Sequence, residues 1–167
     1  MSQMRTYWLP RLAIAGVALL VCGVAAGIDA RQPMPVFRAT TLDGQKYNNE
    51  SVKGKVVLLQ FWATWCKYCR GDQDAVETVA KDFADKGLLV LAVDAGESKK
   101  TVKQYLAKSP RTVPIVLMEN TNLAAMFSAK VYPLYVLIDA DGKVAGELRG
   151  AGGERALRNL LRKAGLE

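Results

Sequence analysis

The strongest chemical signal in the chain is a pair of cysteines with two residues between them, in Trp65-Cys66-Lys67-Tyr68-Cys69. Such a pair can bind zinc, form a structural disulfide or cycle as a redox couple. A closed zinc site needs four ligands, and the chain offers no histidine and one further cysteine, so zinc would require a second chain. A disulfide that closes so short a loop removes little unfolded-state entropy. Redox cycling is the favoured interpretation, with no metal and no cofactor expected.

The two cysteines have different expected roles. Cys66 falls at the predicted N-terminus of a helix, where free backbone N–H groups and the helix dipole favour a thiolate, the reactive form of the thiol. Lys67 adds a nearby positive charge that favours the same form, or is simply solvated. Cys69 lies one helical turn further on and is placed to attack a mixed disulfide formed by Cys66. We therefore expect Cys66 to be an exposed nucleophile and Cys69 a shielded resolving thiol, for exchange in either direction.

Resolution requires Cys69 to lose a proton, and Asp72 is the candidate acceptor. Asp72 lies three residues after Cys69 on the same predicted helical face, within reach directly or through water. The alternative interpretation is an ordinary acidic residue near the start of a helix, where the dipole favours a negative charge. The residue types and their spacing leave both interpretations open.

Composition excludes several other classes of function. The chain has 167 residues, a net charge of +7 and no histidine. Cys-His nucleophiles and histidine-containing metal sites are therefore excluded. Lysine and arginine are scattered among acidic residues instead of forming a stripe with interleaved aromatics, so we expect no nucleic-acid partner. Apolar residues make up 50% of the chain, which is enough to bury a core.

An apolar run near the N-terminus divides the chain into two parts. Residues 12–28 carry no charge, and Arg5 and Arg11 precede them. The run is at the short end of what crosses a bilayer, and the preceding positive charges place the N-terminus inside. We expect residues 1–31 to be a signal or anchor segment, with an anchor in the inner (cytoplasmic) membrane favoured over cleavage near Ala26 and over lipidation at Cys22.

An uncleaved anchor and a cleaved signal peptide would both export the rest of the chain to the periplasm or an equivalent extracytoplasmic space. By the usual size of domains, residues 32–167 form one domain. The remaining alternative, that residues 12–28 are a buried helix of this domain, is disfavoured because the run has no polar face.

Hydrophobic periodicity places the cysteines between a buried strand and a helix. Residues 55–62 are a dense apolar, β-branched run, typical of a strand buried on both faces. The run leads through residues 63–65 into the cysteines. Apolar residues then recur at helical spacing to about Lys86, and Gly87 supplies the stop. The pattern predicts one long helix that begins at the cysteines.

The remaining segments predict a mixed sheet. One hairpin opens the domain around Asp43-Gly44, and another closes the sheet around Asp141-Gly142. Strands that alternate with helices and then meander predict a parallel centre with helices on both faces. The fold class is therefore α/β, a three-layer α/β/α sandwich. The other predicted elements are strands at 88–93, 115–118, 134–138 and 143–149, and helices at 98–108, 122–129 and 154–164.

With these elements placed, residues 35–166 resemble the TlpA/ResA/CcmG family of membrane-anchored thioredoxin-like proteins. The resemblance implies a thioredoxin-like fold with an N-terminal β-hairpin and a central inserted helix within about residues 96–118. It also implies reduction of disulfides in client proteins, with electrons from a membrane protein, and in several relatives a role in cytochrome c or oxidase assembly. The segments that carry it are GKVVLL at 54–59, FWATWC at 61–66 with Cys69-Arg70, Val93 with Gly96-Glu97-Ser98, Tyr132-Pro133, Leu137-Ile138-Asp139 and Asp141-Gly142-Lys143-Val144.

The resemblance also assigns residues to the site. Pro133 matches the cis-proline that packs beside the cysteine pair, where the preceding backbone pairs with a bound peptide, and Tyr132 then shapes the substrate surface. Trp65, Lys67 and Tyr68 are expected at the rim of the site, where a client binds.

Asp72 matches an acidic position of the family, commonly glutamate, near the buried cysteine, and other positions depart from the family pattern. Tyr68 stands where many relatives have proline, and the proline often found soon after the acid is missing at Gln73-Asp74. Gln60 replaces the buried aspartate of thioredoxin itself, which removes that proton route. The alternative functions are a disulfide oxidase or isomerase and, from another class, a non-catalytic thioredoxin-like binding or assembly module.

Overall fold

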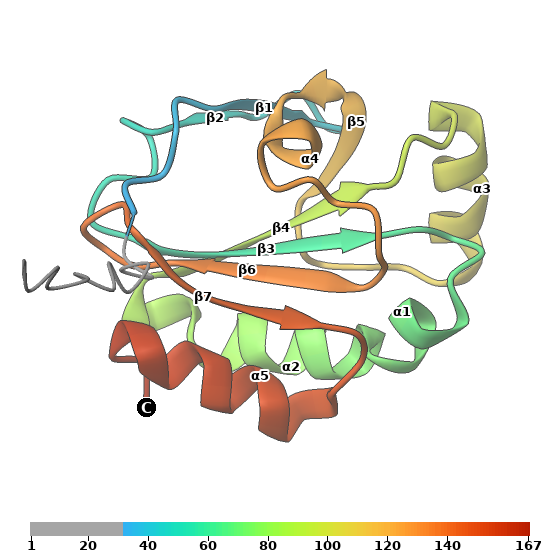
Figure 1. Cartoon of the computed structure of the whole chain (residues 1–167). Helices are drawn as coiled ribbons and strands as arrows, with labels where there is room; N and C mark the ends of the chain where they lie inside the picture. The colour runs from blue at the N-terminus through green and yellow to red at the C-terminus, as the bar shows by residue number, and fades with distance from the viewer. Residues whose placement is uncertain (1–31) are drawn as a thin grey trace, which may run out of the picture.

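A seven-stranded mixed sheet is the centre of the computed structural model, which describes residues 32–167 (Figure 1). The predicted signal or anchor segment, residues 1–31, lies outside the described residues. Among residues 32–167, no helix has the length and apolar character needed to span a membrane. The strands are β1 (Arg38–Thr41), β2 (Lys46–Asn48), β3 (Val56–Trp62), β4 (Leu88–Asp94), β5 (Ile115–Thr121), β6 (Leu134–Ile138) and β7 (Val144–Arg149).

The sheet has the predicted parallel centre. Its order is β2-β1-β5-β4-β3-β6-β7, with β3, β4 and β5 parallel to one another and the outer strands antiparallel to their neighbours. The N-terminal hairpin joins the sheet through β1, which pairs with β5. All seven residues of β3 are buried, as expected for a strand covered on both faces. The site therefore follows a fully buried strand.

Helices cover both faces of the sheet, which confirms the three-layer arrangement. In Figure 1, α2 and α5 lie together on one side of the sheet, and α4 lies on the other. The helices are α1 (Lys67–Gly71), α2 (Gln73–Asp82), α3 (Lys99–Lys108), α4 (Leu123–Met126) and α5 (Gly153–Leu161), with short 3₁₀ turns at Ala84–Lys86 and Arg162–Ala164.

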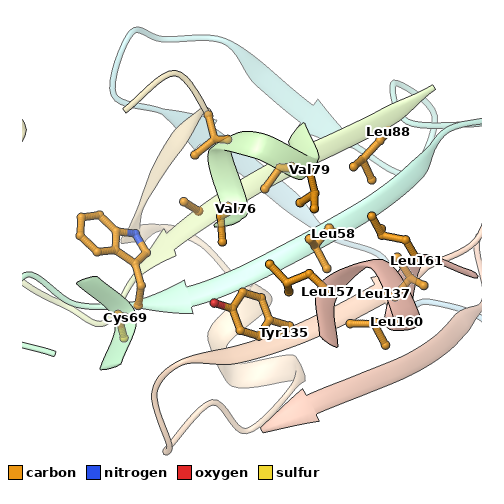
Figure 2. Close-up of a cluster of buried hydrophobic side chains, with 14 of the residues drawn as sticks. Leu58, Cys69, Val76, Val79, Leu88, Tyr135, Leu137, Leu157, Leu160 and Leu161 are labelled. Atoms are coloured by element: carbon orange, nitrogen blue, oxygen red, sulfur yellow. The ribbon is translucent and has the colours of Figure 1, made fainter. Parts of the chain in front are cut away.

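Successive side chains of β3 point to opposite faces of the sheet, so the core is divided into two clusters. Leu58 faces α2 and α5 and packs in one cluster with Val79 and Leu157 (Figure 2), whereas Leu59 lies in the cluster on the opposite face with Leu123. Burial of a leucine side chain contributes about 1.5–3 kcal/mol, so both clusters hold β3 in place. The strand that leads into the cysteines is thus rigidly fixed.

The prediction of one long helix after the cysteines is wrong. The helix ends at Gly71 and a second one begins at Gln73, with Asp72 between them at φ −92° and ψ −2°. Glycine and aspartate are weak helix formers, and the Asp72 carboxylate accepts hydrogen bonds from the distant loop before α5. These distant bonds fix the break.

Local signals predicted most other boundaries. The Ser98 hydroxyl accepts a hydrogen bond from the backbone N–H of Thr101 (3.1 Å) and caps α3. Gly87 takes the left-handed conformation (φ 83°) that ends the helical segment before β4. The prediction for β5 was too short: the strand continues past Met118 to Thr121, where it pairs with β1 at Ala39. That extension depends on a partner strand far away in the sequence.

Candidate active site

Cys66 and Cys69 form a disulfide at the point where β3 gives way to α1. The sulfur atoms are bonded at 2.07 Å and the Cα atoms are 5.2 Å apart. Cys66 is the N-cap of α1, and its Sγ accepts a hydrogen bond from the backbone N–H of Cys69 (3.1 Å). An N–H group directed at Sγ would favour the thiolate once the disulfide is reduced. The geometry agrees with the predicted helix-start position of Cys66.

Both cysteines are shielded in this disulfide form. Cys69 is 3% exposed, as expected, but Cys66 is only 5% exposed, so the prediction of an exposed nucleophile is wrong for this state. The disulfide holds Cys66 Sγ over the first turn of α1, and both cysteines pack into the core cluster that contains Trp62. The residues beside them are exposed instead: Trp65 is 64% and Tyr68 68% exposed, and Lys67 is exposed as well.

The loop before β6 forms one wall of the site. Tyr132 and Pro133 are joined by a cis peptide bond, as the resemblance implied, and Pro133 is buried. Because β6 pairs with β3 so that Leu134 lies opposite Phe61, this loop lies at the same end of the sheet as the cysteines. The rings of Tyr132 and Trp65 meet edge to face at 6.0 Å between centroids. The structure thus brings two of the three aromatic residues predicted for the substrate surface into contact.

Asp72 is buried at the junction of α1 and α2, and three hydrogen-bond donors contact its carboxylate. Its carboxylate accepts hydrogen bonds from the hydroxyl of Tyr135 (3.0 Å) and from the backbone N–H groups of Gly152 (3.1 Å) and Gly153 (3.0 Å). A carboxylate offers about four acceptor positions, so these three donors leave about one for a proton from Cys69. Asp72 is therefore more than an ordinary helix-start acid: it ties the α1–α2 junction to the start of α5.

A buried polar network, which sequence reasoning missed, continues from Asp72 behind the site. The Tyr135 hydroxyl accepts a long hydrogen bond from Gln60 Nε2 (3.4 Å), and Gln60 Oε1 accepts one from Arg111 Nη2 (2.8 Å). Arg111 also pairs with Glu77 (Nε to Oε1, 3.1 Å) and stacks over Trp62. The sequence marks Gln60 as a departure from the buried aspartate of thioredoxin, but no motif marks Arg111 or Tyr135.

Two further carboxylates, Glu97 and Asp94, brace the loop that leads into the cysteines. The Glu97 carboxylate accepts hydrogen bonds from the backbone N–H and the hydroxyl of Thr64, both at 2.6 Å. Asp94, at the end of β4, is fully buried, and its Oδ2 accepts hydrogen bonds from the backbone N–H groups of Gly96 (2.9 Å) and Glu97 (2.7 Å). Its Oδ1 is buried without a hydrogen-bond partner. Burial, together with the nearby Glu97, raises the pKa of Asp94 to about 6.

The geometry suits two-electron thiol-disulfide exchange. In residues 32–167, no group of three or more metal-ligating side chains lies close enough together to hold a metal ion. The reactive groups that the site does bring together are the Cys66–Cys69 disulfide, a carboxylate at Asp72 and an exposed aromatic rim.

Comparison with known proteins gives the same picture. A family model described as Redoxin matches residues 29–161. The thiol-disulfide oxidoreductase ResA of Bacillus cereus is 32% identical over 129 residues, which cover 77% of this chain and 75% of the relative. The thioredoxin-like protein YneN of Bacillus subtilis is 39% identical over 121 residues, which cover 71% of this chain and 70% of the relative.

A solved structure also matches most of the chain. The crystal structure of a thiol:disulfide interchange protein of the thioredoxin family from Chlorobium tepidum aligns with a TM-score of 0.70 at 26% sequence identity. The alignment covers 80% of this chain and 96% of that one. The match extends the similarity from the sequence to the arrangement of the whole described domain.

Proposed function

Because the chain belongs to the TlpA/ResA/CcmG-like family of thioredoxin-like thiol-disulfide oxidoreductases, we propose that it reduces disulfides of client proteins outside the cytoplasm. The observation that carries the proposal is the Cys66–Cys69 disulfide at the start of α1, with an N–H group directed at Cys66 Sγ and an aromatic rim beside it. This pair can exist as a dithiol or as a disulfide, and exchange with a client disulfide requires both states.

In the first step, the Cys66 thiolate of the reduced protein attacks one sulfur of a client disulfide. A bond forms between Cys66 Sγ and that sulfur, the client S–S bond breaks, and the second client sulfur leaves as a thiolate. The hydrogen bond from the Cys69 N–H and the start of α1 stabilise the negative charge on Cys66 before the attack.

In the second step, Cys69 resolves the mixed disulfide. The Cys69 thiol gives its proton to the Asp72 carboxylate, directly or through water, and the resulting thiolate attacks Cys66 Sγ. The Cys66–Cys69 bond forms, the client leaves as a thiolate, and two electrons have passed from the protein to the client. The free acceptor position on Asp72 supports this assignment.

The client binds, in this proposal, across the rim formed by Trp65, Tyr68, Tyr132 and Pro133, with Lys67 beside it. Exposed aromatic side chains supply contact area with little loss of rotamer entropy, which suits binding to varied peptide segments. The edge-to-face contact between Trp65 and Tyr132 holds one side of the rim in place.

The extracytoplasmic location is supported by the uncharged run at residues 12–28, which precedes the domain. In that location, net reduction requires a source of electrons, and we propose a membrane protein that carries a dithiol. Cytochrome c or oxidase maturation is the client pathway that the family resemblance favours. A protease-accessibility assay on spheroplasts checks the location: the domain should be digested from the outside while cytoplasmic markers survive.

The midpoint potential of the Cys66–Cys69 couple tests the direction of exchange. Equilibration in glutathione or dithiothreitol buffers, followed by thiol alkylation, should give a value of about −250 mV or lower. A midpoint potential of about −120 mV would instead identify an oxidase. Unchanged biological function in a Cys66→Ser variant would contradict exchange altogether and favour a non-catalytic binding module.

A further inference from the structure

We propose that Arg111, Gln60 and Tyr135 form a one-way hydrogen-bond chain that holds Asp72 in place to take the proton of Cys69, with Arg111 as the positioning residue at its far end. The proposal rests on the proposed function, because it takes Asp72 as the proton acceptor. None of the three residues contains a thiol, and all three act on the site through Asp72.

The direction of this hydrogen-bond chain is fixed by its two ends, a group that can only donate at Arg111 and a group that can only accept at Asp72. Arginine can only donate hydrogen bonds, so the Gln60 atom that faces Arg111 Nη2 at 2.8 Å must be the carbonyl oxygen. The Gln60 amide nitrogen then faces Tyr135 and can only donate to its oxygen (3.4 Å). The single hydroxyl proton of Tyr135 is left to donate to Asp72 Oδ2 (3.0 Å), which can only accept. Each link therefore points from Arg111 toward Asp72.

Burial makes this direction persistent. Gln60 and Tyr135 are fully buried, and the Arg111 side chain is 1% exposed, so water does not compete for these groups. Burial and the negative charge of Asp72 both raise the pKa of Tyr135, which keeps its hydroxyl protonated and able to donate. Figure 2 shows the Tyr135 hydroxyl directed toward the end of the sheet where Cys69 lies.

The position of Arg111 points to a role beyond stability. Burial lowers the pKa of Arg111, and its pairing with Glu77 only partly offsets that cost. A buried ion pair is often no more stabilising than apolar side chains of similar volume. In this site Arg111 fixes the Gln60 amide. Without it, the amide can turn over and present its oxygen to Tyr135, which then draws the hydroxyl proton away from Asp72.

A two-phase reaction measures the effect on the resolving step alone. Reduced protein is mixed with 5,5′-dithiobis(2-nitrobenzoic acid) in a stopped-flow instrument. Attack by Cys66 releases one coloured thiolate and leaves a mixed disulfide, and attack by Cys69 then releases the second thiolate and closes the Cys66–Cys69 disulfide. The first phase depends on reagent concentration and the second does not, so the two steps separate.

The variants Tyr135→Phe and Arg111→Met, and the double variant of the two, should leave the first phase unchanged, and Asp72→Asn is the reference for loss of the acceptor. The second phase should slow about 100-fold in Asp72→Asn, because general-base catalysis is lost. It should slow about 10-fold in Tyr135→Phe and about 5-fold in Arg111→Met, which removes the donor that fixes the Gln60 amide, since both changes misorient the acceptor. The double variant should be no slower than Tyr135→Phe, because Arg111 acts through Tyr135.

Tyr47→Phe and Arg158→Met are the matched controls. Tyr47 donates to Gln45 (2.7 Å) in the opposite core cluster, and Arg158 pairs with exposed acids, so both variants should resolve at the wild-type rate. Equal slowing by Arg111→Met in the wild-type and Tyr135→Phe backgrounds would overturn the proposal, as would wild-type rates in Tyr135→Phe. Wild-type rates in Asp72→Asn would instead remove Asp72 as the acceptor, and the proposal with it. Circular dichroism confirms that each variant is folded.

Discussion

Replacing Asp94 with asparagine should change how the stability of the protein depends on pH. Asp94 is fully buried, one of its oxygens has no hydrogen-bond partner, and its pKa is raised from 3.8 to about 6. In the unfolded chain, Asp94 loses its proton near pH 3.8, whereas in the folded protein it keeps the proton until about pH 6. The unfolded state therefore binds fewer protons across this window, and stability falls as pH rises through it.

The size of the effect follows from the shift. Each pKa unit corresponds to about 1.4 kcal/mol, so a shift of about two units sets a ceiling of about 3 kcal/mol. Because Glu97 lies close by and influences the same proton, we expect about 1–3 kcal/mol. Relative to wild type, Asp94→Asn should gain this much stability between about pH 4 and pH 7, with no further gain at higher pH.

Urea denaturation at closely spaced pH values measures the difference in unfolding free energy between the two proteins. Asp139→Asn is a matched control, because Asp139 also accepts hydrogen bonds from two backbone N–H groups but lies in the turn before β7, where it is only partly buried. A stability difference that stays constant from about pH 4 to pH 7, or one that moves against the variant as pH rises, would refute the reasoning about Asp94.

Further outcomes are expected at the site and around it. Asp72→Ala should lower the unfolding free energy by about 3 kcal/mol in urea denaturation, because three donors lose their acceptor at about 1 kcal/mol each. Glu97→Ala should speed hydrogen exchange at the Thr64 amide about 5-fold, since both hydrogen bonds from Thr64 to this carboxylate are lost. Trp65→Ala should raise the KM for a peptide disulfide about 5-fold with kcat unchanged, because it removes exposed contact area from the rim.

Each of these outcomes has a clear opposite. A loss below about 0.5 kcal/mol in Asp72→Ala would mean that its hydrogen bonds do not hold the α1–α2 junction. Unchanged exchange at Thr64 in Glu97→Ala would show that the loop is fixed by other contacts. A fall in kcat with constant KM in Trp65→Ala would move Trp65 from client binding to chemistry. Val36→Ala, which removes another exposed apolar side chain outside the rim, is the control for Trp65.

The features that could be predicted from the sequence depend on residues close together in the chain. The disulfide pair at the start of a helix follows from the Cys66–Cys69 spacing and the apolar strand before it. The cap at Ser98 and the stop at Gly87 follow from the conformations those residues favour. The cis bond before Pro133 could be anticipated only through the family resemblance, because local sequence does not specify it.

The features that could not be predicted depend on side chains that meet only after folding. Gln60 contacts Arg111 and Tyr135 across 51 and 75 residues of sequence. Asp72 bonds to Gly152 across 80 residues, and this contact helps to break a helix that periodicity alone extends without interruption. The shielding of Cys66 has a similar origin, because it arises from the closed disulfide and the core around it. No pattern within a single element specifies these partners.

The most direct test of the central claim is to trap a client on the nucleophilic cysteine. A reduced Cys69→Ser variant, incubated with a disulfide-bearing peptide and then treated with acid, should carry one peptide on Cys66, detected by mass spectrometry. The Cys66→Ser variant should carry almost none, because the N-cap position and the hydrogen bond from the Cys69 N–H favour a thiolate at Cys66 and not at Cys69. Equal trapping by both variants, or trapping only on Cys69, would contradict the assignment of Cys66 as the attacking thiol and Cys69 as the resolving one.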